Sequence, residues 1–428
     1  MISSFSKLNF FLHWLKYQLK RLKLRWYRSV SYIIEILVKI WLLKGRSLLS
    51  FFNECYPNFI LQKKQFIENS KGKVIIFFTF RTLHFIDWFA PIHLALKRDF
   101  TEKYEIIYID FSTTLHRIGN GFEYIRFRKQ VEERLTNLKI SNLSHFSHEE
   151  VADYDSFPKP SVIITCESIR QECFSAKERI YLPHYLLPKA NEIDLPSNIR
   201  FNHVFVPSKH PYTYKKLNQN LNTNTKLHMV GYPKLCTVTS QNDCFPNSKL
   251  PVVLYAPSLD LKLIFGALGR GILQIFKDIK FCNFLIKLHP SLASRRHYIN
   301  SFLHEKIQFE KHIKIDDISG IQSLAMASSI MIADFGSMGS EYRLRFGKRV
   351  IYLKTPKKYE GGPDLIFRDK FADAICEVED LQSMIYSVLE KGPLSKSDLE
   401  SMRQQVLSFV GESDEKAADC IHKICSEK

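Results

Sequence analysis

The sequence lacks the signatures of secreted and metal-bound proteins. Its nine cysteines follow no regular spacing and form no Cys-x-x-Cys motif. An odd, unpatterned set of this kind argues against a disulfide framework and a zinc site, and it is typical of reduced thiols in a cytoplasm. Short internal repeats and low-complexity tracts are also missing, so a repeat architecture is not indicated.

Long apolar runs are missing as well. A confident membrane span needs about 20 apolar residues. The best candidate, Val30 to Leu43, is shorter and is interrupted by Glu35 and Lys39. No small-residue cleavage site follows this run, so a signal peptide is not indicated either.

Positive charge is what the sequence has in excess. The formal net charge is +17, and the first 60 residues hold ten Lys and Arg against two Glu. Nearly half of the excess therefore lies in about a seventh of the chain. An excess of this kind implies an anionic partner, which can be lipid headgroups, nucleic acid or a phosphorylated substrate.

Apolar residues near the N-terminus fall at helical spacing beside Lys16, Lys20 and Lys23. The stripe consists of Leu8, Phe11, Leu12, Leu15, Leu19, Leu22 and Trp26. A helix with these two faces is typical of a membrane interface, and each basic residue adds about 1 kcal/mol near an anionic leaflet. We expect residues 1–60 to attach the protein peripherally to the cytoplasmic face of the cell membrane. A single span and an ordinary surface helix remain as alternatives.

The rest of the chain alternates strand-like and helical segments. A length of 428 residues suggests two or three domains. Buried-strand runs such as Val74–Phe78 and Val252–Tyr255 are each followed by a helical stretch, which predicts an α/β fold with doubly wound parallel sheets. The polar, turn-rich segment 236–250 is the best linker. We therefore expect two tandem Rossmann-like domains over residues 61–245 and 246–428.

The segment from Ile330 to Glu341 is the most informative part of the chain. Ile330 to Ala333 predicts a buried strand, residues 334–339 form a small-residue turn, and a helix begins near Ser340 with Glu341 in its first turn. Such a turn places backbone N–H groups and the positive end of a helix dipole where a phosphate can bind. In open α/β sheets ligands bind beyond the carboxyl ends of strands, so we expect a nucleotide-diphosphate site here.

Four motifs in sequence order extend this hypothesis. They are His184 to Lys189, Gly231-Tyr232-Pro233, Leu254 to Ser258 paired with Lys287-Leu288-His289-Pro290, and Asp334 to Glu341. In this order and spacing they resemble the CDP-glycerol glycerophosphotransferase family, the teichoic-acid-type polymerases and primases with a GT-B fold. The resemblance covers about residues 160–355. This chain departs from the family pattern at Tyr185, Lys234 and the sequence Asp334-Phe335-Gly336-Ser337.

The resemblance implies a fold and a reaction. The two domains would form a GT-B-like pair with a cleft between them, the first binding the acceptor and the second the nucleotide donor. Glycerol phosphate, or a related polyol or sugar phosphate, would pass from a CDP-linked donor to a membrane-linked glycan in cell-surface polymer synthesis, releasing CMP. The partners would be this donor, a lipid-linked glycan acceptor and the anionic membrane surface, without nucleic acid, cofactor or metal.

The resemblance also implies roles for single residues. His184 would be the general base for the acceptor hydroxyl, since imidazole titrates near neutral pH. His289 would donate a hydrogen bond to the phosphate, with Pro290 beside it, and Lys189 would offset phosphate charge.

The glycine-containing loop would hold the donor. Ser337 and the N–H groups of Met338 and Gly339 would bind the pyrophosphate, and Glu341 would bind the ribose hydroxyls. Asp334 would hold the turn or a donor hydroxyl.

Other readings stay open. The chain could be a GT-B glycosyltransferase or a relative of the UDP-N-acetylhexosamine 2-epimerases, or a basic protein that binds nucleic acid. His84 and Asp87 follow the first strand, where GT-B acceptor loops lie, but for Asp87 we favour the interpretation as a plain helix N-cap. Gly231 to Pro233 is read as a turn that sets the approach of the two domains. Asp153-Tyr154-Asp155 has the letters of a metal motif but lies in a polar loop.

Overall fold

The computed structural model describes most of the chain after residue 55. The described residues are 56–80, 83–110, 121–140, 145–147, 158–166, 176–183, 186, 201–207, 224–236, 244–289, 297–316, 320–356 and 368–427. Nearly all of the predicted membrane-surface segment, residues 1–60, lies outside these ranges, and the prediction of peripheral attachment is therefore untested. Within the described ranges, no helix has the length and apolar character needed to cross a bilayer.

The first domain is built on a seven-stranded parallel sheet in the order β3-β2-β1-β4-β5-β6-β7. The strands are β1 (Val74–Phe80), β2 (Tyr104–Asp110), β3 (His145–Ser147), β4 (Val162–Thr165), β5 (Glu178–Tyr181), β6 (His203–Val206) and β7 (Lys226–Met229). Strands β1, β2, β4 and β6 are buried over almost their whole length, as expected for a parallel sheet that helices cover on both sides. Its helical segments are α4 (Tyr56–Asn69), η2 (Leu83–Phe85), α5 (Ile86–Asp99), α6 (Gly121–Asn137) and η7 (Pro233–Cys236).

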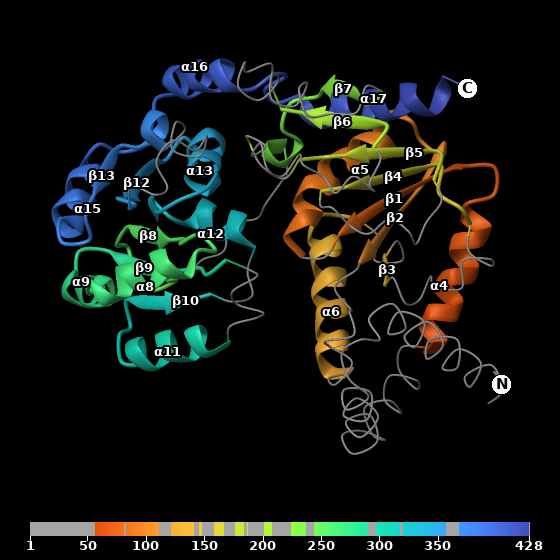
Figure 1. Cartoon of the computed structure of the whole chain (residues 1–428). Helices are drawn as coiled ribbons and strands as arrows, with labels where there is room; N and C mark the ends of the chain where they lie inside the picture. Colours follow the sequence, from red (N-terminus) through yellow and green to blue (C-terminus); the bar gives the residue numbers. More distant parts are fainter. Residues whose placement is uncertain are drawn as a thin grey trace, which may run out of the picture.

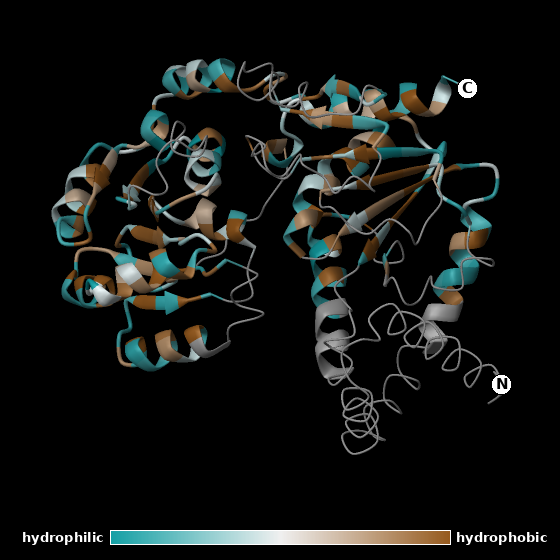
Figure 2. Ribbon diagram, viewed as in Figure 1, coloured by the Kyte–Doolittle hydropathy of each residue, from teal (hydrophilic) through white to brown (hydrophobic). Residues whose placement is uncertain are grey.

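The second domain repeats this topology with six parallel strands in the order β10-β9-β8-β11-β12-β13. The strands are β8 (Val252–Tyr255), β9 (Asn283–Ile286), β10 (Ile313–Ile315), β11 (Ile330–Ala333), β12 (Arg349–Leu353) and β13 (Ala374–Cys376). Its helices are α8 (Leu261–Gly269), α9 (Ile272–Asp278), α11 (His297–Ile307), α12 (Ile321–Ala327), α13 (Met338–Phe346) and α15 (Leu381–Glu390). Figures 1 and 2 show two separate layered bodies, each with apolar strands at its centre.

The strand order reverses at one place in each sheet. In the first domain the chain returns from β3 to pair β4 with β1, and in the second it returns from β10 to pair β11 with β8. At such a switch point the loops on the two sides diverge and leave a crevice in which ligands bind. The prediction of an α/β fold with two tandem Rossmann-like domains is confirmed.

The C-terminal end differs from the predicted division at residues 246–428. Helix α16 (Lys396–Val406) leads toward the first domain, and α17 (Ser413–Ser426) lies against it (Figure 1). Ala417, Ala418, Ile421 and Ile424 of α17 are part of the first domain's core. Their helical spacing makes one apolar face that must be covered, but local sequence does not say which sheet covers it.

Gly231 is the residue that lets this last helix approach. Its φ of +80° lies in the left-handed region, and a Cβ atom there would lie 2.2 Å from Ser413 Oγ at the start of α17. The backbone N–H of Tyr232 donates to the same hydroxyl at 3.0 Å. The Gly-Tyr-Pro turn therefore joins the end of β7 to the returning helix.

Candidate functional site

The buried carboxylate of Asp334 holds the shape of the loop after β11. Asp334 is 3% exposed. It accepts hydrogen bonds from the backbone N–H groups of Ser258, at 2.8 Å, and Phe335. Ser258 follows β8, so Asp334 joins the two loops that flank the switch point of the second sheet. Burial raises the pKa of Asp334 to about 6, against the effect of the two N–H donors.

The start of α13 is shaped by two glycines. Gly336 has a φ of +97°, in the left-handed region that favours glycine. A Cβ atom at Gly339 would lie 2.3 Å from the hydroxyl of Tyr352 on β12, so the first turn packs too closely for a larger residue. Ser337 is the residue before the helix and is partly exposed. The first N–H groups of a helix have no acceptor within it, so Met338 and Gly339 present N–H groups at this edge of the sheet.

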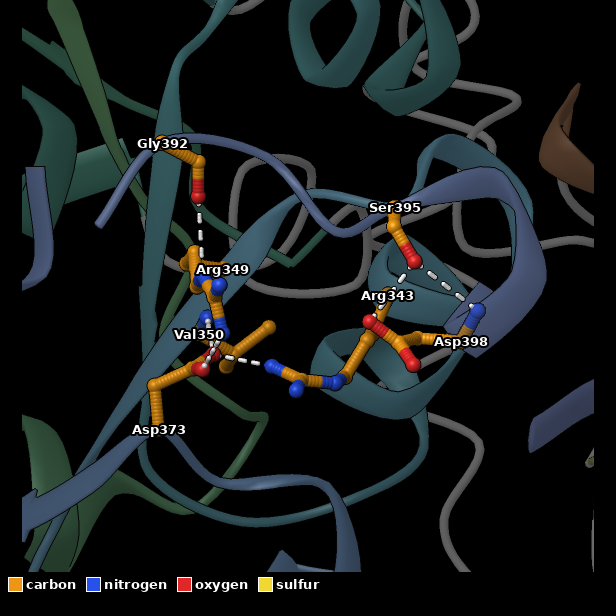
Figure 3. A network of polar contacts seen from close by, with 7 residues as sticks. All are labelled: Arg343, Arg349, Val350, Asp373, Gly392, Ser395 and Asp398. Atoms are coloured by element: carbon orange, nitrogen blue, oxygen red, sulfur yellow. Dashed lines mark hydrogen bonds and ion pairs between the residues drawn. The ribbon is translucent and has the colours of Figure 1, made fainter. Parts of the chain in front are cut away.

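The body of α13 is anchored inside the second domain. Arg343 points from α13 to Asp373, which also accepts from Arg349 Nη1 and from the backbone N–H of Val350, each at 2.8 Å (Figure 3). Arg403 of α16 donates to the carbonyl of Leu344 at 2.6 Å near the end of α13.

Helix α16 has its own cap. Ser395 is the N-cap residue of α16, and its hydroxyl accepts a hydrogen bond from the backbone N–H of Asp398 at 3.1 Å (Figure 3). With its last turn and its side held in this way, α13 presents its N-terminus in a fixed direction.

Glu341 joins the two domains. Its carboxylate accepts hydrogen bonds from Tyr232 Oη and Ser337 Oγ, each at 2.8 Å, and forms an ion pair with Lys234 Nζ. Glu341 and Lys234 are about 5% exposed. The Lys234 ammonium also lies 3.8 Å from the centre of the Trp88 ring. We call Trp88, Tyr232, Lys234, Ser337 and Glu341 the interdomain cluster.

This geometry bears on the expected role of Glu341. The carboxylate predicted to bind ribose is directed at first-domain side chains, and it also orients the hydroxyl of Ser337. A small pocket opens beside it between η7, α12 and α13, with Met338 and Glu341 among its lining residues. Ser337, Met338, Gly339 and Glu341 are thus brought together at the place where α13 meets the first domain.

A second row of contacts lies next to the interdomain cluster. Arg345 donates to the carbonyl of Lys234 at 2.8 Å, and burial lowers the pKa of Arg345 to about 10. Asp87 is 2% exposed and accepts from Arg134 Nε at 2.9 Å. The guanidinium of Arg134 lies against Gly320, where a Cβ atom would be 3.1 Å away.

The N-cap reading of Asp87 is therefore wrong. The N-cap of α5 is Phe85, and Asp87 lies inside the first turn. Its carboxylate binds Arg134, whose guanidinium contacts the second domain.

His289 also faces the first domain. It follows β9 by three residues, and its ring centroid lies 6.3 Å from that of His84 in η2, edge to face at 69°. Burial lowers the pKa of His289 to about 4, so the ring is neutral at physiological pH. The segments that follow the carboxyl ends of β1 and β9 therefore contact each other through the rings of His84 and His289.

Three of the predicted site residues lie outside the described ranges. They are His184, Lys189 and Pro290, and their roles stay predictions. The Asp153 to Asp155 motif also lies outside. Among the described residues, no group of three or more His, Cys, Asp or Glu side chains is placed to hold a metal ion.

Sequence reasoning missed Trp88, Tyr232 and Lys234 as parts of the site. The Gly-Tyr-Pro motif was read as a turn only. The sequence did offer one signal, which is that Lys234 is a cation directly after this turn, where the similar family has arginine. A buried cation needs an acidic partner, and this partner is Glu341.

Comparisons with solved structures identify proteins that share this fold. No protein-family model matches the sequence, and no curated protein matches it. The structure is similar to the UDP-GlcNAc 2-epimerase from Neisseria meningitidis bound to UDP-GlcNAc, with 14% identity, a TM-score of 0.53, and coverage of 83% of this chain and 100% of that one.

Two further solved structures are similar to the same extent. The UDP-GlcNAc 2-epimerase from Methanocaldococcus jannaschii, in complex with UDP-GlcNAc and UDP, has 15% identity and a TM-score of 0.52, with 83% and 100% coverage. The S. aureus MnaA–UDP structure has 12% identity and a TM-score of 0.52, with 83% and 96% coverage. At these identities the likeness shows the fold, and the GT-B-like pair of domains is confirmed. The resemblance to the CDP-glycerol glycerophosphotransferases gains no support here.

Proposed function

We propose that this chain is an enzyme that acts on a nucleoside-diphosphate-linked sugar, with the diphosphate bound at the start of α13. The observation that carries the proposal is the loop from Asp334 to Ser337. It lies at the switch point of the second sheet, leads into the first N–H groups of α13, which have no acceptor within the helix, and stands beside the first-domain residues that hold Glu341.

The physical argument for a diphosphate is local. The N–H groups of Met338 and Gly339, the Ser337 hydroxyl and the positive end of the α13 dipole all favour an anion at this point. Gly336 lets the loop adopt its left-handed turn before the helix, and Gly339 lets the first turn of α13 pack closely on Tyr352. Asp334 stays inside the loop, bonded to two N–H groups, so it holds the shape of the loop without repelling a phosphate directly.

We propose roles for the remaining site residues. A neutral His289 can donate a hydrogen bond to a phosphate or sugar oxygen and accept one with its other nitrogen. In our proposal Glu341 positions Ser337 and joins the domains, in place of the ribose contact expected from the sequence. His184 remains the proposed general base, and Lys189 and Pro290 remain proposed contacts of the donor.

A UDP-linked sugar is the favoured donor. The similar solved structures are described as bound to UDP-GlcNAc or UDP, and they share the two-domain arrangement that forms the proposed site. Within this class the reaction is either epimerisation of the sugar or its transfer to an acceptor.

A second candidate is transfer of glycerol phosphate from a CDP-linked donor to a lipid-linked glycan, with release of CMP. The observation in its favour is the order and spacing of the four motifs, from His184-x-x-x-x-Lys189 to Asp334 through Glu341. The basic apolar stripe of residues 1–60 would hold such an enzyme at the membrane that carries its acceptor.

A donor screen separates these functions. Thermal shift of the full chain is measured with UDP-GlcNAc, other UDP-sugars, GDP-sugars and CDP-glycerol, and the products are then analysed. We expect UDP-GlcNAc or another UDP-sugar to give the largest stabilisation. Preferential stabilisation by CDP-glycerol, with CMP release on adding a lipid-linked glycan, would establish the second candidate. No stabilisation by any nucleotide-linked donor would contradict both.

Liposome co-sedimentation tests the membrane contact separately. We expect the full chain to bind vesicles with anionic headgroups and to lose binding when residues 1–55 are deleted. Equal binding of both forms would contradict a membrane-surface segment at the N-terminus.

A further inference from the structure

Each domain contributes one imidazole to the same place. His84 lies in η2, directly after β1, and His289 follows the carboxyl end of β9. The two ring centroids are 6.3 Å apart. Both strands end at the edge of their sheets where open α/β folds bind ligands, and the two edges meet at these rings.

The distance between this pair and the diphosphate loop fits a sugar. In the second sheet β8 lies between β9 and β11. Since neighbouring strands are about 4.8 Å apart, the end of β9, which leads to His289, lies about 10 Å along the edge from the end of β11. That is the scale of a hexose joined to a diphosphate. A donor with its phosphates on Met338 and Gly339 would therefore extend its sugar toward the two imidazoles.

The surroundings of the pair suit a neutral, hydroxyl-bearing group. His84 lies 5.9 Å from the Trp88 ring, centroid to centroid. The same indole ring carries Lys234 at 3.8 Å, and Lys234 is paired with Glu341. Asp87, in the next turn, pairs with Arg134. Trp88 is 3% exposed, so its ring backs His84 from inside the fold and the nearby charges are paired. The two imidazoles can supply both donors and acceptors, and the hydroxyls of a sugar need both kinds of partner.

We propose that His84 and His289 form a composite subsite, one imidazole from each domain, for the sugar ring of a nucleotide-linked donor. The proposal rests on the proposed function and deepens it. It assigns substrate contact to His84, which none of the four motifs includes. It also makes the sugar contact depend on both domains, whereas the diphosphate loop belongs to the second domain alone.

The test compares binding of UDP with binding of UDP-GlcNAc by isothermal titration calorimetry on the full chain. The variants are His84→Ala, His289→Ala and the double variant, with His304→Ala on the exposed side of α11 as the matched control. We expect each single variant to weaken UDP-GlcNAc binding about tenfold, the loss of roughly one hydrogen bond, and to change UDP binding less than about twofold. The double variant should lose less than the product of the two single effects, because both rings contact one group.

Two further measurements keep the proposal testable if His84→Ala folds poorly. His84→Asn retains a donor and an acceptor and should recover part of the lost affinity. In the unaltered protein, the imidazole ¹⁵N resonances of His84 and His289 should both move on addition of UDP-GlcNAc and stay in place with UDP.

The outcomes separate the two proposals. Normal UDP-GlcNAc binding by His84→Ala, or an equal loss of UDP and UDP-GlcNAc binding, overturns the composite subsite and leaves the proposed function intact. An unaltered protein that binds neither UDP nor UDP-GlcNAc overturns the favoured function, and the subsite with it.

Discussion

The two sheets share a strand order but carry different side chains at their switch points. In the second domain the loop after β11 consists of Asp334, Phe335, Gly336 and Ser337, and it offers backbone N–H groups. In the first domain the segment after β1 carries rings, with His84, Phe85 and Trp88 within two turns. The shared topology places a switch point in each sheet, but the side chains there differ. In our proposal the second domain therefore contacts the diphosphate, and the first domain helps to contact the sugar.

The interdomain cluster is where the two halves depend on each other. Glu341 belongs to the helix of the proposed diphosphate loop, and three of its neighbours in the cluster come from the first domain. A substitution in one domain's part of the cluster should therefore change the stability of the contacts made by the other domain. The predictions that follow break this relation or sharpen it, starting with the strongest.

The largest effect is expected from Glu341→Ala. The change leaves the Lys234 ammonium and the Tyr232 hydroxyl buried without their acceptor, which typically costs about 3–5 kcal/mol for a broken buried pair. We expect the free energy of unfolding to fall by about that amount in urea denaturation. Glu379→Ala, at an exposed position, should change it by less than about 0.5 kcal/mol. Equal effects of the two variants would contradict the role of Glu341 as a buried joint.

Gly231→Ala is expected to loosen α17 from the first domain. The left-handed backbone alone costs a non-glycine residue about 1–2 kcal/mol, and the Cβ atom would clash with Ser413 Oγ. Gly271→Ala is a matched control, because Gly271 has a φ of +81° and no atom within 4 Å of its would-be Cβ.

The difference between these two variants isolates the contact with α17. We expect Gly231→Ala to lose about 1–3 kcal/mol more in the free energy of unfolding than Gly271→Ala, which is the usual cost of overpacking. Matching losses would show that α17 does not need the close approach at Gly231.

His289 should make the fold less stable as the pH falls. Its folded pKa of about 4 lies below the ordinary histidine pKa of 6.5, so between these values the unfolded chain binds a proton that the folded chain does not. Stability should fall as pH drops from about 6.5 to about 4, by at most about 1.4 kcal/mol per pH unit. Urea denaturation across this range should show the slope in the wild type, with a smaller slope in His289→Asn.

Asp334 should change the stability of the fold with pH in the opposite direction. Its folded pKa is about 6 and the ordinary aspartate pKa is 3.8, so the folded chain binds the extra proton between these values. This carboxyl group should therefore add stability as pH falls from about 6 to about 4. Relative to Asp334→Asn, the wild type should become more stable over this interval. A wild type that becomes less stable relative to the variant would contradict the raised pKa.

The smallest effect is expected from Ser337→Ala. Ser337 donates one hydrogen bond to a carboxylate that keeps two other donors. We expect a loss of about 1 kcal/mol in the free energy of unfolding and a weaker binding of UDP, since the hydroxyl is also a proposed phosphate contact. Unchanged UDP affinity would remove Ser337 from the proposed site.

Local patterns were enough to predict the strand and the helix on either side of the proposed diphosphate loop. The apolar run Ile330 to Ala333 is β11, and the helix expected from 340 to 346 is α13, which begins two residues earlier. Strand and helix periodicity depends on residues close in sequence, so these predictions needed no knowledge of tertiary structure.

The contacts between distant residues could not be predicted in the same way. Glu341 is more than 100 residues from Tyr232 and Lys234 in the chain, and α17 packs on the first domain from the far end of the sequence. His84 and His289 also meet only through the approach of the two domains. A single sequence carries no signal for such pairs beyond an unpaired charge or an apolar face that needs a partner.

The central claim is that a nucleotide's diphosphate binds at the start of α13, and a structure of the chain with UDP tests it most directly. We expect a diphosphate oxygen within hydrogen-bond distance, about 2.7–3.2 Å, of the backbone N–H of Met338 or Gly339. A diphosphate bound away from these two N–H groups, or no bound nucleotide at millimolar UDP, would contradict the account.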